Sequence, residues 1–355
     1  MAGVRDSIFY FLNSNKTSND SDAFLENGSL LLEDLITFSN GRYDNPIRRF
    51  SMEELSEATN GFNSNQIITA NPTYKMYEGS LENRPVLIKK YDKINNGYGW
   101  GSSAVKSRSI RDLAMLALMS SHKNALKLLG CCLDFEFPAP VCEHPGSTKV
   151  LSDYLYRTER GMPCRGSLTW KSRVKIANEI ANVVIYMHTM FPTPIILRGI
   201  SPPSVILDQF GTAKLLEFSS SISLPPGETQ VSLDCVIGIF GRIDPEYYAG
   251  GILTEKADVY GFGVFILDLL TGKRPSEIEL GDDQLLETRV KECLEEEKLN
   301  ELLDQRIVEE GGGIGQQVQA LTTLALRCIQ CKKEDRPEMI DVGRELRRIQ
   351  RSALD

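Results

Sequence analysis

The stretch that decides the fold is Leu253-Thr-Glu-Lys-Ala-Asp-Val-Tyr-Gly-Phe-Gly-Val264. It passes from charged residues into an apolar run, Val259-Tyr-Gly-Phe-Gly-Val-Phe-Ile-Leu267, which ends at Asp268. This run is far shorter than the roughly 20 apolar residues that span a bilayer. The pattern therefore predicts a helix over about 255–271 inside a globular protein, and we expect no transmembrane segment.

From about residue 146 onward, the patterns are mostly helical. The other long ones cover 168–190, 284–304 and 316–330. From about 47 to 145, strand-like runs such as Pro85-Val-Leu-Ile-Lys-Lys-Tyr91 prevail, with one helical pattern over 104–119. The predicted fold class is α+β, with a small β-rich lobe (about 47–145) before a large helical lobe (about 146–350).

Residues 1–46 form a separate N-terminal extension. Within it, Leu30-Leu-Leu-Glu-Asp-Leu-Ile-Thr-Phe38 places apolar residues at 31, 35 and 38, which is typical of a short amphipathic helix. Ser29 is the expected N-cap and Gly41 the expected stop. Such a helix either packs on its own domain or docks onto a partner.

The composition and the N-terminal residues exclude several classes of partner and of cellular location. The net charge of −8 leaves no global basic field for nucleic acid or anionic lipid. The N-terminus lacks the features of a signal peptide, and Ala2 excludes myristoylation, so we expect a cytosolic protein. The eight cysteines show no disulfide spacing, and we expect Cys328-Ile-Gln-Cys331 to pack in a helix rather than bind metal.

Residues about 50–350 resemble the protein-kinase fold, and in detail the plant receptor-like kinase branch. Five stretches carry the resemblance in the correct order: Phe50-Ser-Met-Glu-Glu-Leu-Ser-Glu-Ala-Thr-Asn-Gly-Phe62, Leu128-Leu-Gly-Cys-Cys-Leu-Asp134, Asp244-Pro-Glu246, Leu253–Val264 and Asp335-Arg-Pro337. The resemblance implies one bilobal kinase-like domain over 47–350.

The phosphate-covering loop of that family is degraded. It should read G-x-G-x-x-G-x-V, since glycine alone lets the backbone come close to phosphates. Aligned on Met76-Tyr-Glu-Gly79, the glycine positions hold Thr69, Asn71 and Tyr74, and Pro72 removes a backbone donor between them. We expect this loop to hold a triphosphate poorly.

One nucleotide-binding residue survives. The lysine that binds the phosphates in that family corresponds to Lys89 in Val86-Leu-Ile-Lys89. Its usual glutamate partner corresponds to Asp112, whose side chain is one methylene shorter. Two interpretations stay open: a vestigial ATP contact, or a lysine retained to satisfy an acid inside the small lobe.

Most of the residues that carry out phosphoryl transfer in that family are replaced. In Leu197-Arg-Gly-Ile-Ser-Pro-Pro-Ser204, Gly199 replaces the catalytic aspartate, Ser201 the phosphate-binding lysine and Ser204 the metal-binding asparagine. Each such contribution commonly spans roughly a hundredfold in rate, so their joint loss should bring turnover near background. The metal-binding D-F-G reads Glu217-Phe-Ser219, and magnesium tolerates altered geometry badly. We expect no catalytic residue, no metal site and no cofactor, with ATP bound weakly if at all.

The fold-supporting residues of the family are retained. Phe218 is expected to pack against the helix of the small lobe, Glu246 and Arg336 to form an ion pair, and Asp258 to accept backbone hydrogen bonds near the catalytic loop. A chain that keeps these residues and loses the chemistry is expected of a kinase fold used for binding.

The N-terminal segment Asn27-Gly-Ser-Leu-Leu-Leu-Glu-Asp-Leu-Ile36, with Asn45-Pro-Ile-Arg-Arg-Phe-Ser51, resembles the pseudokinase adaptors of coiled-coil NLR immune receptors. This resemblance implies a cytosolic scaffold of plant innate immunity that binds such a receptor together with an effector-modified receptor-like cytoplasmic kinase or a pathogen effector, and that partners could bring to the plasma membrane. Two alternatives remain: a weakly active or atypical Ser/Thr kinase, and an allosteric regulator of another kinase.

Overall fold

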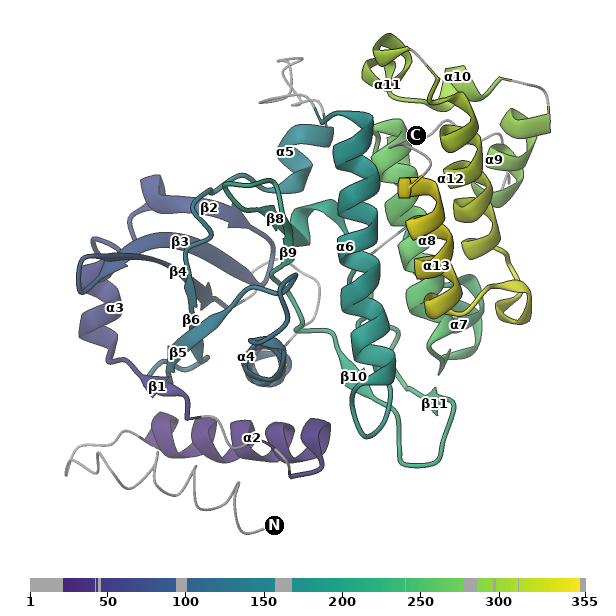
Figure 1. Cartoon of the computed structure of the whole chain (residues 1–355). Coiled ribbons are helices and arrows are strands. Elements are labelled where there is room, and N and C mark those ends of the chain that lie inside the picture. Colours follow the sequence, from purple (N-terminus) through teal and green to yellow (C-terminus); the bar gives the residue numbers. More distant parts are fainter. Residues whose placement is uncertain are drawn as a thin grey trace. The chain divides into compact units, whose positions relative to one another are not determined.

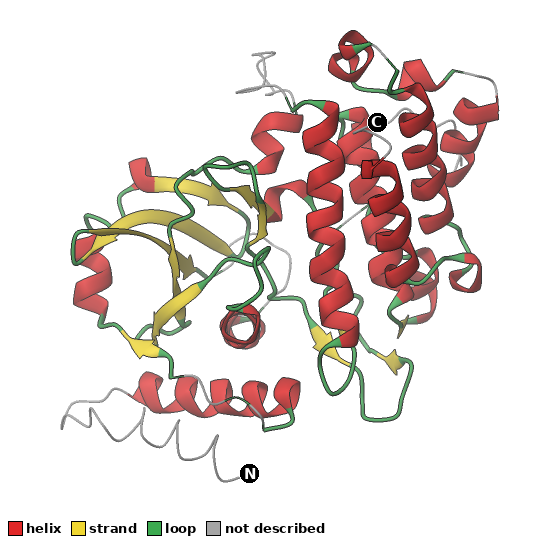
Figure 2. Ribbon diagram, viewed as in Figure 1, coloured by secondary structure: helices red, strands yellow, loops and turns green. Residues whose placement is uncertain are grey.

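A computed structural model describes residues 22–351 except 42, 44–45, 94–100, 157–167, 240, 278–285, 296–297 and 312, with only the backbone of 286–289. The chain divides into two compact units (Figures 1 and 2). The first comprises residues up to 149 with 207–209 and 214–223, and the second comprises 150–206, 210–213 and the chain from 224 onward. The fold class is α+β, as the sequence predicts.

The first unit is built on a six-stranded sheet in the order β1-β5-β6-β4-β3-β2. The strands are β1 (Arg48–Arg49), β2 (Ile67–Ala70), β3 (Tyr74–Leu81), β4 (Arg84–Tyr91), β5 (Leu128–Cys132) and β6 (Ala139–Glu143). Strands β3 and β4 form a hairpin whose two-residue turn, Glu82-Asn83, has both residues at positive φ. Such a turn matches the right-handed twist of the strands and fixes their register.

Helices complete the first unit: α2 (Asp22–Ser39), α3 (Met52–Ala58) and α4 (Ser102–Met119), with a 3-10 turn, η1 (Ser64–Gln66). Helix α2 packs against α4, whose axis it crosses (Figure 1). Leu31, Leu35 and Phe38 are buried as the periodicity predicts. The predicted start is wrong, because Ser29 lies inside the helix. Phe24 is also buried and extends the apolar face upstream.

The second unit is mostly helical and carries the stretch that decided the fold. Its helices are α5 (Leu151–Leu155), α6 (Trp170–Thr189), α7 (Pro245–Gly250), α8 (Lys256–Thr271), α9 (Leu286–Glu295), α10 (Leu299–Leu302), α11 (Gln305–Glu310), α12 (Gly315–Cys328) and α13 (Met339–Arg351), with 3-10 turns η2 (Pro202–Ser204), η3 (Pro275–Glu277) and η4 (Lys333–Asp335). The predicted helix over 284–304 falls partly outside the described residues, and α9 and α10 are two separate helices.

The remaining strands are short: β7 (Ile195–Ile196), β8 (Val205–Leu207), β9 (Ala213–Leu215), β10 (Ile222–Ser223), β11 (Val231–Ser232) and β12 (Ile252–Leu253). Strands β7, β11 and β12 belong to the second unit and β10 to the first, and the residues of β8 and β9 are divided between the two. Strand β11 pairs with β12 in antiparallel orientation.

Helix α8 forms the centre of the helical core. Its residues from Gly261 to Thr271 are all buried. A Cβ built on Gly263 would lie 2.6 Å from the Cβ of Cys328, so only glycine allows α8 and α12 to approach this closely. The helix ends at Gly272, whose φ of 63° suits a residue without a side chain. Among the described helices, none has both the length and the apolar character that crossing a bilayer requires.

Candidate functional site

The turn between β2 and β3 stands where the phosphate-covering loop would be. The side-chain oxygen of Asn71 accepts hydrogen bonds from the backbone N–H groups of Thr73 at 2.8 Å and Tyr74 at 2.9 Å. It also accepts one from the Thr73 hydroxyl at 2.8 Å. Because Pro72 has no N–H group, the donors of this turn are either absent or used by the protein itself. The turn thus offers little for a phosphate to bind.

Lys89 lies in β4 and is completely enclosed. Its ammonium donates to the Asp112 carboxylate at 2.7 Å and to the backbone carbonyl of Leu216 at 2.6 Å. It also lies 4.5 Å from the centre of the Tyr74 ring, a cation–π contact. With 1% of the residue exposed, the ammonium is bound on several sides by protein groups.

Asp112 of α4 is as fully engaged as Lys89. Its Oδ2 accepts a second hydrogen bond from the Tyr91 hydroxyl at 2.8 Å, and its Oδ1 accepts the backbone N–H of Phe218 at 2.7 Å. Burial, together with the neighbouring Asp112 and Glu217 carboxylates, raises the pKa of both Tyr74 and Tyr91 well above the usual value. Both phenols are therefore neutral hydrogen-bond donors at physiological pH.

Sequence reasoning missed the contacts that the two tyrosines of this cluster make with Lys89 and Asp112. Tyr74 and Tyr91 are register partners in the β3–β4 hairpin, and their rings lie 5.6 Å apart. The period of two in β4, which places Tyr91 on the same face as Lys89, was the available signal.

Glu217, at the position of the metal-binding aspartate, accepts hydrogen bonds from neighbouring side chains. Its two carboxylate oxygens accept from the Asn71 amide at 3.1 Å and the Ser219 hydroxyl at 2.7 Å. Phe218, next in the chain, is fully buried. The carboxylate that could have held magnesium instead connects the β2–β3 turn to the segment around Phe218.

The degraded catalytic loop belongs to the second unit. Gly199 leaves open space, because a Cβ built there would meet only the Leu197 carbonyl oxygen at 3.9 Å. Ser204 donates to the carbonyl of Ser201 at 2.7 Å, and its hydroxyl oxygen lies 3.3 Å from the Ser201 backbone nitrogen. The two serines are buried and satisfy each other, so neither presents a charge or a free amide in place of the lost lysine and asparagine.

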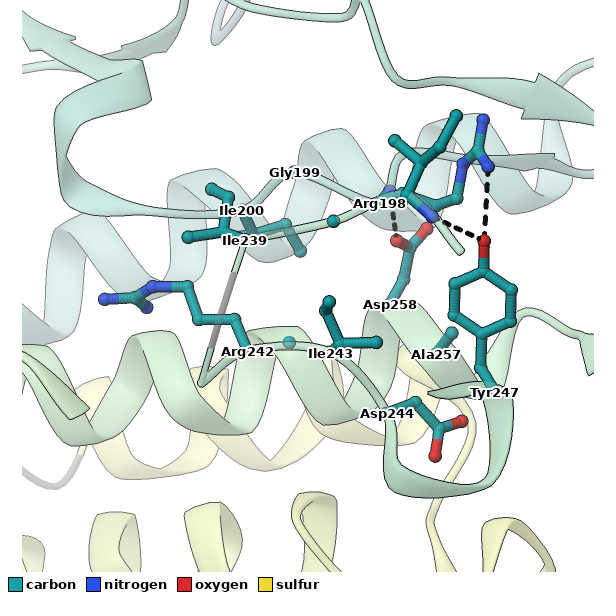
Figure 3. A pocket seen from close by; sticks show the side chains of 13 residues that line it. Arg198, Gly199, Ile200, Ile239, Arg242, Ile243, Asp244, Tyr247, Ala257 and Asp258 are labelled. Carbon is teal, nitrogen blue, oxygen red and sulfur yellow. Dashed lines mark hydrogen bonds between the residues drawn. The ribbon is translucent and has the colours of Figure 1, made fainter. Parts of the chain in front are cut away.

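Asp258 supports this loop from α8 (Figure 3). Its carboxylate accepts the backbone N–H groups of Leu197 at 2.8 Å and Arg198 at 2.9 Å, and it contacts Nε2 of His188 at 2.9 Å. Arg198 has a φ of 60°, which is costly for a residue with a side chain. The two hydrogen bonds hold the loop in this conformation, as expected from the sequence.

A small cavity of about 20 Å³ lies beside Gly199, lined also by Ile200, Ile239 and Tyr247 (Figure 3). The Tyr247 hydroxyl accepts the backbone N–H of Ile237 at 3.0 Å. The space suffices for about one water molecule.

The prediction of an ion pair between Glu246 and Arg336 is wrong. Arg336 is buried and pairs with Asp244 at 2.7 Å, whereas Glu246 accepts the backbone N–H of Lys333 at 2.7 Å. Asp244 caps α7, and its buried carboxylate reaches the guanidinium. Both contacts still connect α7 to the segment around η4.

Comparisons with known proteins agree with this architecture. Residues 68–346 match the family model described as protein tyrosine and serine/threonine kinase. The chain is 40% identical to "Serine/threonine-protein kinase ZRK1" of Arabidopsis thaliana over 93% of this chain and 92% of the relative. It is 39% identical to "Non-functional pseudokinase ZED1" of the same plant, over 92% of this chain and 96% of that one.

A third Arabidopsis relative, "Non-functional pseudokinase ZRK2", is 37% identical over 92% of this chain and 89% of its own length. Several relatives thus carry names that mark them as inactive, which supports an inactive kinase. From the fold, the sequence match and these relatives, the chain belongs to the protein tyrosine and serine/threonine kinase family, in the branch of its plant pseudokinases.

Proposed function

We propose that this chain is a catalytically inactive pseudokinase that works as a cytosolic adaptor in plant innate immunity. Its partners would be a coiled-coil NLR receptor and an effector-modified receptor-like cytoplasmic kinase or a pathogen effector. The resemblance of the N-terminal segment to such adaptors supports the choice of partners.

The enclosure of Lys89 is the observation that carries the loss of catalysis. Its ammonium would have to leave Asp112, the Leu216 carbonyl and the Tyr74 ring before it could hold a phosphate. Leaving Asp112 as an unpaired buried charge is costly, since desolvation is then uncompensated. We therefore propose that Lys89 and Asp112 act as a structural pair and that the protein uses no nucleotide cofactor.

The remaining site residues support the same division of roles. Gly199, Ser201, Ser204 and Glu217 no longer carry phosphoryl-transfer groups in usable positions. Phe218, Asp258, Glu246 and Arg336 bind backbone groups or pack in the interior, and we propose that they maintain a rigid surface for partners.

Co-purification tests the adaptor role. The chain would be expressed with each coiled-coil NLR of its host, alone and together with candidate receptor-like cytoplasmic kinases. We expect a stable complex with at least one receptor. Failure to bind any receptor would refute the adaptor role, and association with an active kinase alone would favour the allosteric regulator.

A parallel phosphoryl-transfer assay addresses the competing enzyme function that the name of ZRK1 raises. The purified chain would be incubated with radiolabelled ATP, magnesium and a generic protein substrate. Incorporation above background that disappears in Lys89→Met would refute the loss of catalysis while leaving receptor binding to be judged separately.

A further inference from the structure

A groove of about 280 Å³ lies between α12 and α13 in the second unit, and none of the residues of the degraded site lines it. The two helices pack against each other (Figure 1). From α12 it is lined by Gln316, Gln319, Ala320, Thr323, Leu324 and Arg327, and from α13 by Glu345 and Arg348. The positions on α12 follow the i, i+3, i+4, i+7 spacing of a single helix face.

The floor of the groove is small and apolar. Leu324 is buried and Ala320 is half-buried, so the short side chain of Ala320 leaves room between the helices. Above this floor, Gln316 and Gln319 are exposed. A primary amide both donates and accepts hydrogen bonds, which matches the alternating groups of a peptide backbone.

The charge of the groove is positive. The Glu345 carboxylate is held by Arg348, with a shortest separation of 2.6 Å, and this hydrogen bond lowers the pKa of Glu345. The positive charge of Arg327 also lowers the pKa of Glu345. Among the residues that the structure describes, however, Arg327 has no ion-pair partner. Once Arg348 neutralises Glu345, the charge of Arg327 remains.

One further arginine extends this positive edge along α13. Arg344, Arg348 and Arg351 are spaced i, i+4, i+7 and share a face of the helix. Arg344 pairs with Asp341 at 2.7 Å, as Arg348 pairs with Glu345, so Arg351 is the member of this row that adds positive charge. The surrounding protein is acidic, with a net charge of −8, so this basic edge is a local exception. Complementary charge steers partners toward such a patch.

We propose that the α12–α13 groove binds an acidic segment of a partner protein in an extended conformation. The amides would pair with the backbone of the segment, and the arginines with its carboxylates. The concave shape and the acceptor oxygens of Gln316 and Gln319 favour a peptide over a membrane or a nucleic acid, whose phosphates need only donors. The inference does not depend on the loss of catalysis.

Fluorescence anisotropy with the full chain tests the proposal. The probe is a short dye-labelled peptide of alternating glutamate and leucine, and the reference peptide carries glutamine in place of glutamate. We expect the acidic peptide alone to bind, and Arg327→Glu to weaken it roughly three- to tenfold, as expected for reversing one exposed charge near a carboxylate. Arg84→Glu, an exposed arginine in the first unit, is the matched charge control and should leave binding unchanged.

A second variant separates shape from charge. Ala320→Phe keeps the net charge and fills the floor, so it should also weaken binding. Thermal unfolding verifies that both variants fold. Equal binding by Arg327→Glu and Arg84→Glu would overturn the proposal, because it would mean that only overall charge matters. Binding of phosphatidylserine vesicles without binding of the acidic peptide, or no binding of the peptide at all, would also overturn it.

Discussion

Replacing Lys89 by methionine should destabilise the protein strongly, which would not be expected of a lysine whose role is to hold a nucleotide. The change leaves the Asp112 carboxylate buried without its cation, since Lys89 is 1% exposed and 2.7 Å from that carboxylate. Breaking a buried ion pair by removing one partner costs about 3–5 kcal/mol. For a unit of about 150–250 residues this corresponds to a fall in the unfolding midpoint of roughly 6–20 °C.

The neighbouring Lys90 provides a matched control. Its ammonium lies over the Phe62 ring at 4.4 Å, and the side chain is only half-buried. Lys90→Met should therefore cost less than about 1 kcal/mol. Scanning calorimetry and urea unfolding monitored by circular dichroism would compare the two variants.

A double variant isolates the ion pair. Lys89→Met with Asp112→Asn removes both charges, while the asparagine oxygen can still accept one of the hydrogen bonds that Tyr91 and Phe218 donate to Asp112. It should recover part of the stability lost in Lys89→Met. Together with the single variant Asp112→Asn, it completes the double-mutant cycle that measures the coupling. If Lys89→Met proves no more harmful than Lys90→Met, the proposed structural role of Lys89 is wrong.

Three further predictions concern other parts of the molecule. Burial, with smaller effects of two nearby lysines, lowers the pKa of His122; its stabilising contribution should be complete above about pH 6.5 and decline as the pH falls through the lower folded-state value. His122→Asn keeps a hydrogen-bond acceptor but does not titrate in this range. The free energy of unfolding, measured between pH 7.5 and pH 5, should therefore depend less on pH in the variant. An unchanged pH dependence would contradict this role of His122. Gly199→Asp should fold normally, because space is available there, and should show no phosphate incorporation in a radiolabel assay. Asn27→Ala should cost about 1–3 kcal/mol in urea unfolding, because its buried amide donates to two backbone carbonyls at 2.9 Å; Ser29→Ala, exposed on the same helix, should cost little, and equal losses would disprove this role of Asn27.

Much of the fold follows from the sequence because its patterns are local. The helix around Leu253–Val264 and the strand carrying Lys89 were predictable from the periodicity of their apolar residues. The start of α2 was not, because Ser29 resembles an N-cap while the burial of Phe24 depends on the helix against which α2 packs. Boundaries decided by tertiary packing cannot be read from capping residues alone.

The candidate site divides in the same way. The loss of Gly199 and of the loop glycines is visible in the sequence, since it concerns residue types at fixed spacings. The enclosure of Lys89 and Glu217 is not visible in the sequence. The contact of the Tyr74 ring with Lys89 and the hydrogen bond from Asn71 to Glu217 depend on the tertiary structure. The partner of Arg336 was misassigned for the same reason, since Asp244 and Glu246 both precede or begin α7 and only the geometry selects Asp244.

A titration of the purified wild-type chain with ATP and magnesium, followed by thermal unfolding, tests the central claim most directly. A ligand that binds only the native state must raise the unfolding midpoint by mass action. The account predicts no rise up to millimolar nucleotide, because the groups that would hold the phosphates are bound by protein atoms. A rise that depends on magnesium and disappears in Lys89→Met would contradict it.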